Sequence, residues 1–391
     1  MRRDAASARV HARLISDGSD GAAGALPDRI EALVGEEAPL LGPRQRARVV
    51  GEVLAAVEGL GPLQPLLADP AVTDVLVNGP GPGKVWVERN GLLRRVPIEL
   101  TGATIEHLIE KVVAPLGLRV DRASPVVDAR LPDGSRVNAV VPPLAVDGPC
   151  LTIRRFGART LPVDAFAPAP VAALLGWAVV ARLNLLVSGG TGAGKTTLLN
   201  ALGAHIPPGE RVVTVEDAAE LRLPGEHVVR LEARPANAEG AGEVKVRDLV
   251  RNALRMRPDR ILVGEVRGPE ALDMLQAMNT GHEGSLSTCH ANTPSDALRR
   301  IETMVLMGEV NLSSGSVRSQ VRSAIDLVVQ VARRPGGARR VMAVAEVLPG
   351  AGEEGDEGVR LLAGPDGVVA LPSRPPRVPW APPPDPGWCT P

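Results

Sequence analysis

The spacing of hydrophobic and polar positions changes several times along the chain. Residues 1–45 show weak periodicity and are rich in alanine, glycine and charge, so we expect a flexible N-terminal arm or a loosely attached helix. Residues 46–156 start with helical spacing up to Gly59. They continue with alternating runs such as VTDVLVNG and KVWVERNGLLRRVPI, then a hairpin pattern around Asp133-Gly134. This region is predicted to be a small α+β domain.

The rest of the chain follows a different pattern. Residues 157–168 have the composition of a linker. Over residues 169–350 helix-like and strand-like runs alternate, which is typical of an α/β domain with a parallel sheet. Residues 351–391 are too rich in proline and glycine to join a sheet, so they are predicted to be a disordered tail.

Composition narrows the class of protein. The 44 basic and 45 acidic residues give a net charge of −1, so no overall basic field would attract nucleic acid or an anionic membrane. Three dispersed cysteines without a CxxC pair argue against a disulfide framework and fit a reducing compartment. The longest apolar run, VAALLGWAVVA, is interrupted by Arg182 and Asn184 before it reaches bilayer-spanning length. We therefore expect any role at a membrane to depend on partner proteins.

One motif carries specific chemistry. The segment GGTGAGKT follows a β-type run and precedes helix formers, which is the context of a phosphate-binding loop. Its backbone N–H groups and the following helix N-terminus would hold phosphates, Lys195 would reach the β and γ phosphates, and Thr196 would hold Mg²⁺. No lysine lies in a guanine-recognition element, so the expected nucleotide is ATP. The predicted cofactor-binding residues here are Gly189, Gly190, Thr191, Gly192, Ala193, Gly194, Lys195, Thr196 and Thr197.

Three further strand candidates end in polar groups. Glu216 ends RVVTVE, Glu265 follows RILVG, and His290 ends GSLSTCH. The carboxyl ends of parallel strands meet at one edge of a sheet, so we expect these groups to gather around the loop phosphates. Either glutamate could orient the attacking water or organise the metal shell, because hydrolysis needs both functions. The aspartate that usually precedes such a glutamate is replaced by Gly264.

At this point the sequence resembles the type II and type IV secretion (traffic) ATPases, most closely those of tight-adherence pilus assembly. The resemblance covers about residues 45–350 and rests on seven blocks in the same order: GPLQPLLADPAVTDVLVNGPG, SPVVDARLPDGSRVNAVVPP, LTIRRFG, SGGTGAGKTTLLNAL, VEDAAEL, LRMRPDRILVGEVRGPEA and TGHEGSLSTCHANTP. It implies a RecA-like P-loop domain, a smaller N-terminal domain, ATP with Mg²⁺, and a hexameric ring.

The resemblance also implies roles for individual residues. Glu216 lies in a block similar to the family's Asp box and would be the general base, while Glu265 lies in a Walker B segment where glycine is usual before the glutamate. His282 and His290 match the His box near the γ-phosphate. Arginines of the N-terminal domain would reach the nucleotide; the candidates, unranked, are Arg130, Arg136, Arg154 and Arg155.

Two groups of residues have competing interpretations. In GHEGSLSTCHANT, Cys289 and His290 are adjacent in a strand and would point to opposite faces, which disfavours a zinc site or a Cys–His nucleophile and leaves Cys289 as a packing residue. Arg247, Arg251 and Arg255 recur at helical spacing, which fits either a solvated stripe or a subunit contact in a ring.

These observations favour a cytoplasmic ATPase, associated with the inner face of the membrane through platform proteins, that powers pilus assembly or protein secretion. One alternative is a motor for conjugation or DNA uptake. Nucleic acid is an unexpected partner, because near-neutral charge and scarce aromatic residues give no obvious groove for a strand. The other alternative is a regulator that binds nucleotide without hydrolysing it.

Overall fold

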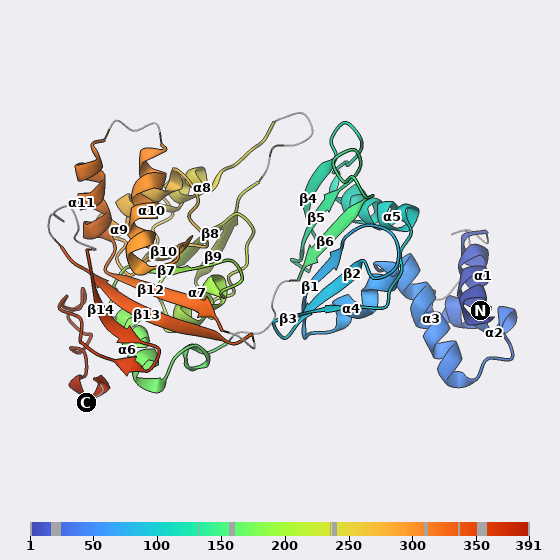
Figure 1. The fold of residues 1–391 in the computed structure, drawn as a ribbon, viewed down its shortest axis with the longest axis horizontal. Coiled ribbons are helices and arrows are strands. Elements are labelled where there is room, and N and C mark those ends of the chain that lie inside the picture. Colours follow the sequence, from blue (N-terminus) through green and yellow to red (C-terminus); the bar gives the residue numbers. More distant parts are fainter. Residues whose placement is uncertain are drawn as a thin grey trace. The chain divides into compact units, whose positions relative to one another are not determined.

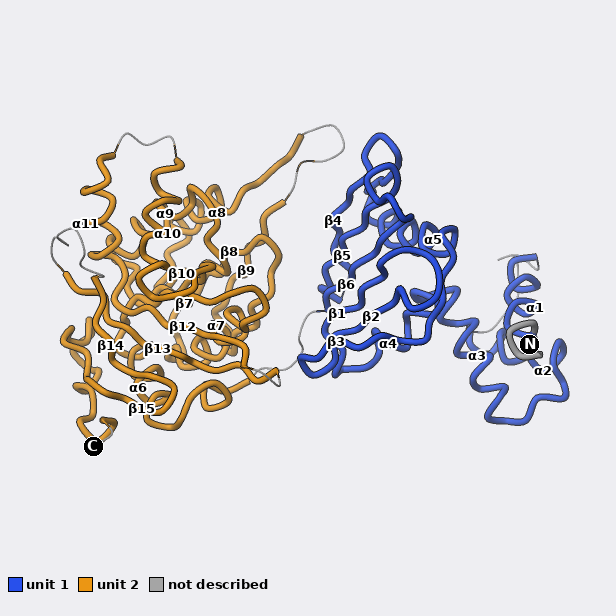
Figure 2. The backbone as a smooth tube through the Cα atoms, in the orientation of Figure 1, with its two compact units in different colours: residues 1–156 blue, residues 157–391 orange. Residues whose placement is uncertain are grey.

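The computed structural model describes residues 2–16, 25–131, 133–155, 161–234, 236, 241–308, 312–334, 337–349 and 358–389. The chain divides into two compact units, residues 1–156 and 157–391 (Figures 1 and 2). Each unit has its own hydrophobic core.

The first unit begins with three helices, two of which lie in residues 1–45, where a flexible arm or a loosely attached helix was predicted. They are α1 (Arg2–Ser16), α2 (Leu26–Glu37) and α3 (Pro43–Val57). Each helix contributes one buried pair of apolar residues four positions apart to a shared cluster, namely Val10 and Leu14, Ile30 and Val34, and Val49 and Val53. The flexible-arm alternative was wrong, while α3 agrees with the helical spacing predicted up to Gly59. One such pair is a weak signal in a single helix, whereas three pairs packed together bury a core.

The remainder of the first unit is an antiparallel sheet covered by a helix, as the α+β prediction required. The six strands run in the order β3-β2-β1-β6-β5-β4. Side chains of α5 (Gly102–Val113) pack on one face of the sheet, against Val75 and Ile153 among others. The strands are β1 (Val72–Val77), β2 (Val85–Arg89), β3 (Leu92–Arg95), β4 (Val126–Arg130), β5 (Arg136–Val140) and β6 (Cys150–Arg154), and the short α4 (Gln64–Ala68) precedes them.

The second unit is built on a nine-stranded sheet with the order β15-β14-β13-β12-β7-β11-β10-β8-β9. The six strands from β12 to β9 in this order are parallel, and the others are antiparallel additions. The strands are β7 (Leu185–Gly189), β8 (Val212–Glu216), β9 (Val228–Glu232), β10 (Arg260–Val263), β11 (Leu286–His290), β12 (Leu327–Arg333), β13 (Arg339–Val347), β14 (Val359–Gly364) and β15 (Gly367–Val368).

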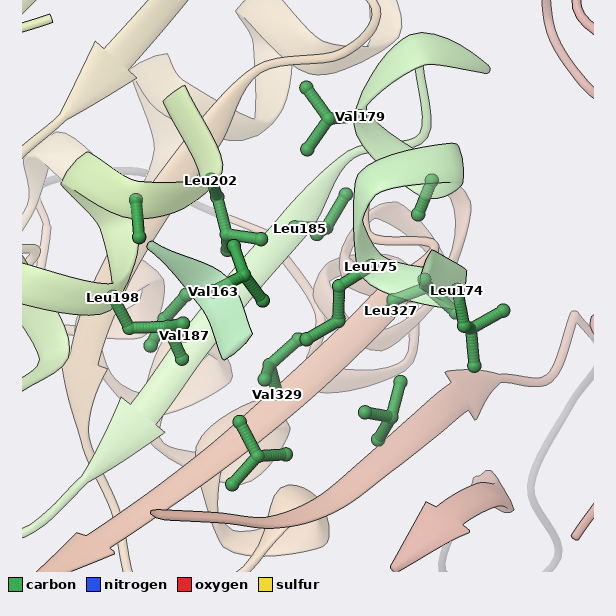
Figure 3. Packing of buried hydrophobic residues seen from close by; sticks show 14 of the residues in the cluster. Val163, Leu174, Leu175, Val179, Leu185, Val187, Leu198, Leu202, Leu327 and Val329 are labelled. Atoms are coloured by element: carbon green, nitrogen blue, oxygen red, sulfur yellow. The ribbon is translucent and has the colours of Figure 1, made fainter. Parts of the chain in front are cut away.

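Helices cover both faces of this sheet. On one face α6 (Ala169–Val180) and α7 (Lys195–Gly203) pack against Leu185, Val187 and Val329 (Figure 3). On the other face Leu186 and Val328 meet four helices: α8 (Val246–Ala253), α9 (Glu270–Asn279), α10 (Pro294–Leu306) and α11 (Ser314–Ala324). The near-continuous apolar runs of these strands follow from burial on both faces, as the parallel-sheet prediction required.

The C-terminal residues were predicted to be disordered, and this was wrong for residues 358–389. They add β14 and β15 to the sheet, and the segment that follows packs on α6, where Trp177 Nε1 donates a hydrogen bond to the carbonyl of Pro382. The ring of Trp388 lies edge-on to Trp177. Proline excludes a residue from a central strand but not from an extended segment that packs through its side chains. Residues 350–357, 390 and 391 lie outside the described part.

The predicted linker is also partly incorporated. Residues 157–160 lie outside the described part of the chain. Beyond them, Val163 and Phe166 are almost fully buried in the core beneath α6. This half of the linker is therefore part of the second unit.

Candidate active site

The phosphate-binding loop has the backbone that the motif predicts. It leaves the buried strand β7 and enters α7 at Lys195, with Gly192 and Gly194 at positive φ of 69° and 94°. A Cβ on Gly189 would lie 2.3 Å from the carbonyl oxygen of Val331 on β12, so a side chain cannot be accommodated there. Glycine is therefore required at these positions by conformation and by space.

Lys195 connects this loop to the neighbouring strands. Its Nζ donates hydrogen bonds to the carbonyls of Gly189 and Gly190, both at 3.2 Å, and lies 3.3 Å from His290 Nε2 and 3.9 Å from Glu265 Oε1. The strands that carry these groups, β7, β11 and β10, are consecutive in the sheet. The structure thus brings three of the four predicted catalytic residues together at the carboxyl edge.

The two carboxylate oxygens of Glu265 differ, because only one of them accepts a hydrogen bond. Its Oε2 accepts a hydrogen bond of 2.8 Å from Arg267 Nε. Its buried Oε1 lies 2.9 Å from His290 Nε2 without hydrogen-bond geometry, and it accepts no hydrogen bond from any described residue. Burial and the nearby Lys195 lower the pKa of His290. The site therefore holds a carboxylate oxygen beside Lys195 and a histidine biased towards its neutral form.

Glu216 lies on β8, the next strand, and is only 3% exposed. Its Oε2 accepts backbone N–H bonds from Glu220 at 2.7 Å and Leu221 at 3.0 Å. Burial raises the pKa of this carboxyl even though those two bonds favour its ionised form. A Cβ on Gly264 would lie 2.7 Å from Glu216 Cγ. The glycine before Glu265 therefore makes room for Glu216.

The two histidines of GHEGSLSTCHANT lie at opposite ends of β11, so the prediction that both face the nucleotide is wrong for His282 within this unit. His290 ends the strand at the phosphate loop. His282 precedes the strand, where its carbonyl accepts a bond from Ser285 Oγ. Five residues of strand span roughly 16 Å. The motif's eight-residue spacing did not reveal how much of it is strand.

Cys289 faces away from this cluster. It is fully buried in the core on the α8–α11 face, and burial raises the pKa of its thiol to about 12. It is therefore a packing residue and a poor nucleophile, as the alternation along β11 predicts. Among the residues that the structure describes, no group of three or more histidine, cysteine or acidic side chains is placed to hold a metal ion.

The N-terminal arginine candidates divide into two sets. Arg130, Arg136 and Arg154 are directly paired across β4, β5 and β6, and Arg154 is paired with Asp74 on β1, so they form a row on one face of the sheet. Arg155 instead donates hydrogen bonds to backbone carbonyls of its own unit, including that of Val72 at 3.0 Å. Arg155 therefore has a structural role within its own unit, and its assignment to the nucleotide stays a prediction.

The arginine stripe on α8 has an explanation that the sequence did not suggest. Arg247 Nε and Arg251 Nε donate to the two carboxylate oxygens of Asp273 on α9, at 2.8 and 2.7 Å. Asp273 is nearly buried. Two of the three arginines therefore hold α8 against α9, and Arg255 is exposed.

Two polar residues near the site escaped the sequence analysis. Arg267 donates a hydrogen bond to Glu265. In the sequence, its position two residues after Glu265 was the only indication of this contact. Gln330, the one polar residue within LVVQV, accepts a hydrogen bond from Ser188 Oγ and donates to the carbonyls of Ala291 and Asn292 just after His290. It links the strand before the phosphate loop to the turn after β11.

The fold and this site define a P-loop NTPase with a RecA-like parallel sheet. A family model described as type II/IV secretion system protein matches residues 56–347. A putative conjugal transfer protein of Mycobacterium tuberculosis is 45% identical over 299 residues, covering 73% of this chain and 84% of that protein. The type IV secretion system protein PtlH of Bordetella pertussis is 40% identical over 315 residues, covering 71% and 91%.

The chain belongs to the type II/IV secretion system protein family. The solved structure of the ATPase DotB from Yersinia pseudotuberculosis shares the fold at 17% identity, with a TM-score of 0.53 over 73% of this chain and 77% of that one. In the described part of this chain, no helix has the length and apolar character needed to cross a membrane.

Proposed function

We propose that this chain hydrolyses ATP and uses the energy to drive a type II/IV-type machine for protein secretion or pilus assembly. The observation that carries the proposal is the convergence of Lys195, Glu265 and His290 beside an intact phosphate loop. Phosphoryl transfer to water requires little covalent chemistry from the protein, so positioning and charge stabilisation of this kind are sufficient.

The site suggests a role for each group. Lys195 would bind the β and γ phosphates, and Glu265 Oε1, which accepts no hydrogen bond from the described residues, would orient the attacking water. Glu216, whose raised pKa suits a proton acceptor, is the general-base candidate. Its engagement with the backbone of Glu220 and Leu221 leaves the choice between the two acids to experiment. His290, at the end of β11, would contact the γ-phosphate and respond to its presence.

The residues also fit Mg²⁺. Thr196, half-buried at the start of α7, and Glu265, with its buried Oε1 open, provide the hard oxygen atoms that this ion prefers. A bound Mg²⁺ would neutralise charge that develops on the β and γ phosphates. Thr197 and the loop N–H groups would hold the remaining phosphate oxygens.

Assembly would complete the site. We propose a hexameric ring on the cytoplasmic side of the membrane, attached to inner-membrane platform proteins. In this ring the row of Arg130, Arg136 and Arg154 would act on bound nucleotide. The similarity to tight-adherence pilus ATPases stays a prediction.

Conjugal transfer is the second candidate, because the M. tuberculosis relative carries that description. The near-zero net charge of the chain still argues against direct binding of nucleic acid. A regulator that binds nucleotide without hydrolysing it is the third possibility, and the two acids at the strand ends argue against it.

The test is Mg²⁺-dependent ATP turnover by the purified protein, with and without single-stranded DNA, compared with Glu265→Gln. Glutamine keeps the shape but removes the charge, so we expect normal ATP binding and roughly 100-fold slower turnover. Binding without turnover in the wild type would favour the regulator. Stimulation by DNA would favour conjugation.

A further inference from the structure

The hairpin of β12 and β13 places two arginines at the same edge as the phosphate loop. Arg333 ends β12 and Arg339 begins β13, and the two are directly opposite each other in the antiparallel register, so their side chains share a face. Strand β12 pairs with β7 on the side away from β11. These arginines therefore flank the loop on the side opposite to Glu265 and His290.

Both side chains approach loop glycines. A Cβ on Gly194 would lie 2.5 Å from Arg339 Cδ and 3.2 Å from its Nε, so the stem of Arg339 runs against the loop backbone. A Cβ on Gly192 would lie 3.8 Å from Arg333 Nη1. At Gly194 the absence of a side chain is what lets Arg339 approach so closely, whereas Arg333 lies at an ordinary contact distance from Gly192.

This arrangement suits a bound anion, because guanidinium groups placed beside the phosphate loop can donate charge-assisted hydrogen bonds to phosphate oxygens. In the proposed function, Lys195, His290 and Glu265 would lie at the γ end of the nucleotide, on the β11 side of the loop. A phosphate chain that crosses the loop from that end would bring its α-phosphate to the β12 side.

We infer that Arg339, with Arg333 beside it, binds the α-phosphate end of the nucleotide. The inference rests on the proposed function, since it adds a contact to the same nucleotide site. The sequence signal is the run ARRPGGARR, in which four arginines flank a glycine turn. Two of them, Arg333 and Arg339, face the loop.

The experiment compares Arg339→Met with Arg340→Met in the full chain, using calorimetry with ADP and ATP. Methionine keeps an unbranched stem against Gly194 and removes the charge. Arg340 is the matched control, because it neighbours Arg339 on β13 and its Nη2 donates instead to the carbonyl of Pro365 at 2.8 Å. We expect Arg339→Met to weaken ADP and ATP by the same factor, about tenfold or more, as for hydrogen bonds to a charged group.

Arg340→Met should leave both affinities unchanged, and Arg339→Lys should retain much of the binding because it keeps the charge. In turnover, KM for ATP should rise with the dissociation constant while kcat changes far less. Three results would overturn the inference: unchanged affinities in Arg339→Met, a loss confined to ATP, which would mean a γ contact, or an equal loss in Arg340→Met. A wild type that binds neither nucleotide would refute the proposed function instead.

Discussion

At the amino-terminal edge of the nine-stranded sheet, the carboxylates of Glu210 and of the buried Asp326 are matched by guanidinium or backbone donors. Arg260, fully buried, pairs with Glu210 at 2.6 Å, and Asp326 accepts bonds from the backbone N–H of Asn184 and from Arg377 at 2.7 and 2.9 Å. At the carboxyl edge, Glu265 keeps a buried oxygen that accepts no hydrogen bond from the described residues. One edge therefore uses its charges for stability, and the other leaves capacity for a ligand.

The largest effect is expected from a substitution that disrupts the ion pairs at the amino-terminal edge of the sheet. Asp326→Ala leaves Arg374 and Arg377 without their shared carboxylate and should lower the free energy of unfolding by about 3–5 kcal/mol. Denaturant unfolding measures this, with Asp366→Ala in the exposed β14–β15 turn as the control. A loss below 1 kcal/mol would mean that the network contributes no more than a surface ion pair.

The next largest effect is expected from a substitution at the carboxyl edge of the sheet. Lys195→Ala removes the charge that the loop directs at the phosphates and should reduce kcat for ATP by roughly 10³-fold while the fold is kept. Steady-state turnover measures the loss, and circular dichroism checks the fold. Wild-type turnover in the folded variant would contradict the assignment of the nucleotide to this site.

A smaller effect is expected at His290, and it allows a direct comparison of the two edges, because His290 and His282 belong to one motif but lie at opposite ends of β11. His290→Ala should slow turnover about 100-fold, the lower end of what one positioned group contributes. His282→Ala and Cys289→Ser should change turnover little, since these side chains lie at the other edge and in the core. Parallel loss of activity in His282→Ala would place it at the nucleotide in the assembled ring.

The smallest effect concerns pH. Burial raises the pKa of Glu216 in the fold, so the folded protein holds this proton more tightly than the unfolded chain does. Stability from this group is present below its unfolded pKa and declines as pH rises through its raised folded pKa. Glu216→Gln should remove that decline, and unfolding measured from pH 4 to 8 should show a gain over wild type that grows with pH. A constant difference would mean that Glu216 ionises normally.

The sequence predicts the carboxyl edge well for a physical reason. Parallel strands bring their ends together whatever their order, so Glu265 and His290 could be assigned from strand ends to the site that the GGTGAGKT motif gave for Lys195. The amino edge could not be predicted in this way. Its pairs join residues far apart in the chain, such as Asp326 with Arg377, and no local pattern reports such a contact.

Other failures have similar causes. The exclusion of β14 and β15 came from the proline content of the whole C-terminal segment, whereas the two strands themselves, Val359–Gly364 and Gly367–Val368, contain no proline. The Asp273 partner of Arg247 lies 26 residues away on another helix, so a helical stripe alone could not indicate it. The substitution of Gly264 for aspartate was visible in the sequence, but its reason, the side chain of Glu216 from the next strand, required the sheet order.

The ion pairs of Asp326 with Arg374 and Arg377 also set an order of events during synthesis. Arg374 and Arg377 follow Asp326 by 48 and 51 residues, so a growing chain on the ribosome contains every candidate catalytic group before it can neutralise this carboxylate. Until those arginines emerge, the nascent domain carries an acid that its folded interior cannot bury unpaired. The phosphate loop is thus made early, but the domain that supports it can reach its final stability only once residue 377 has been translated and released from the exit tunnel.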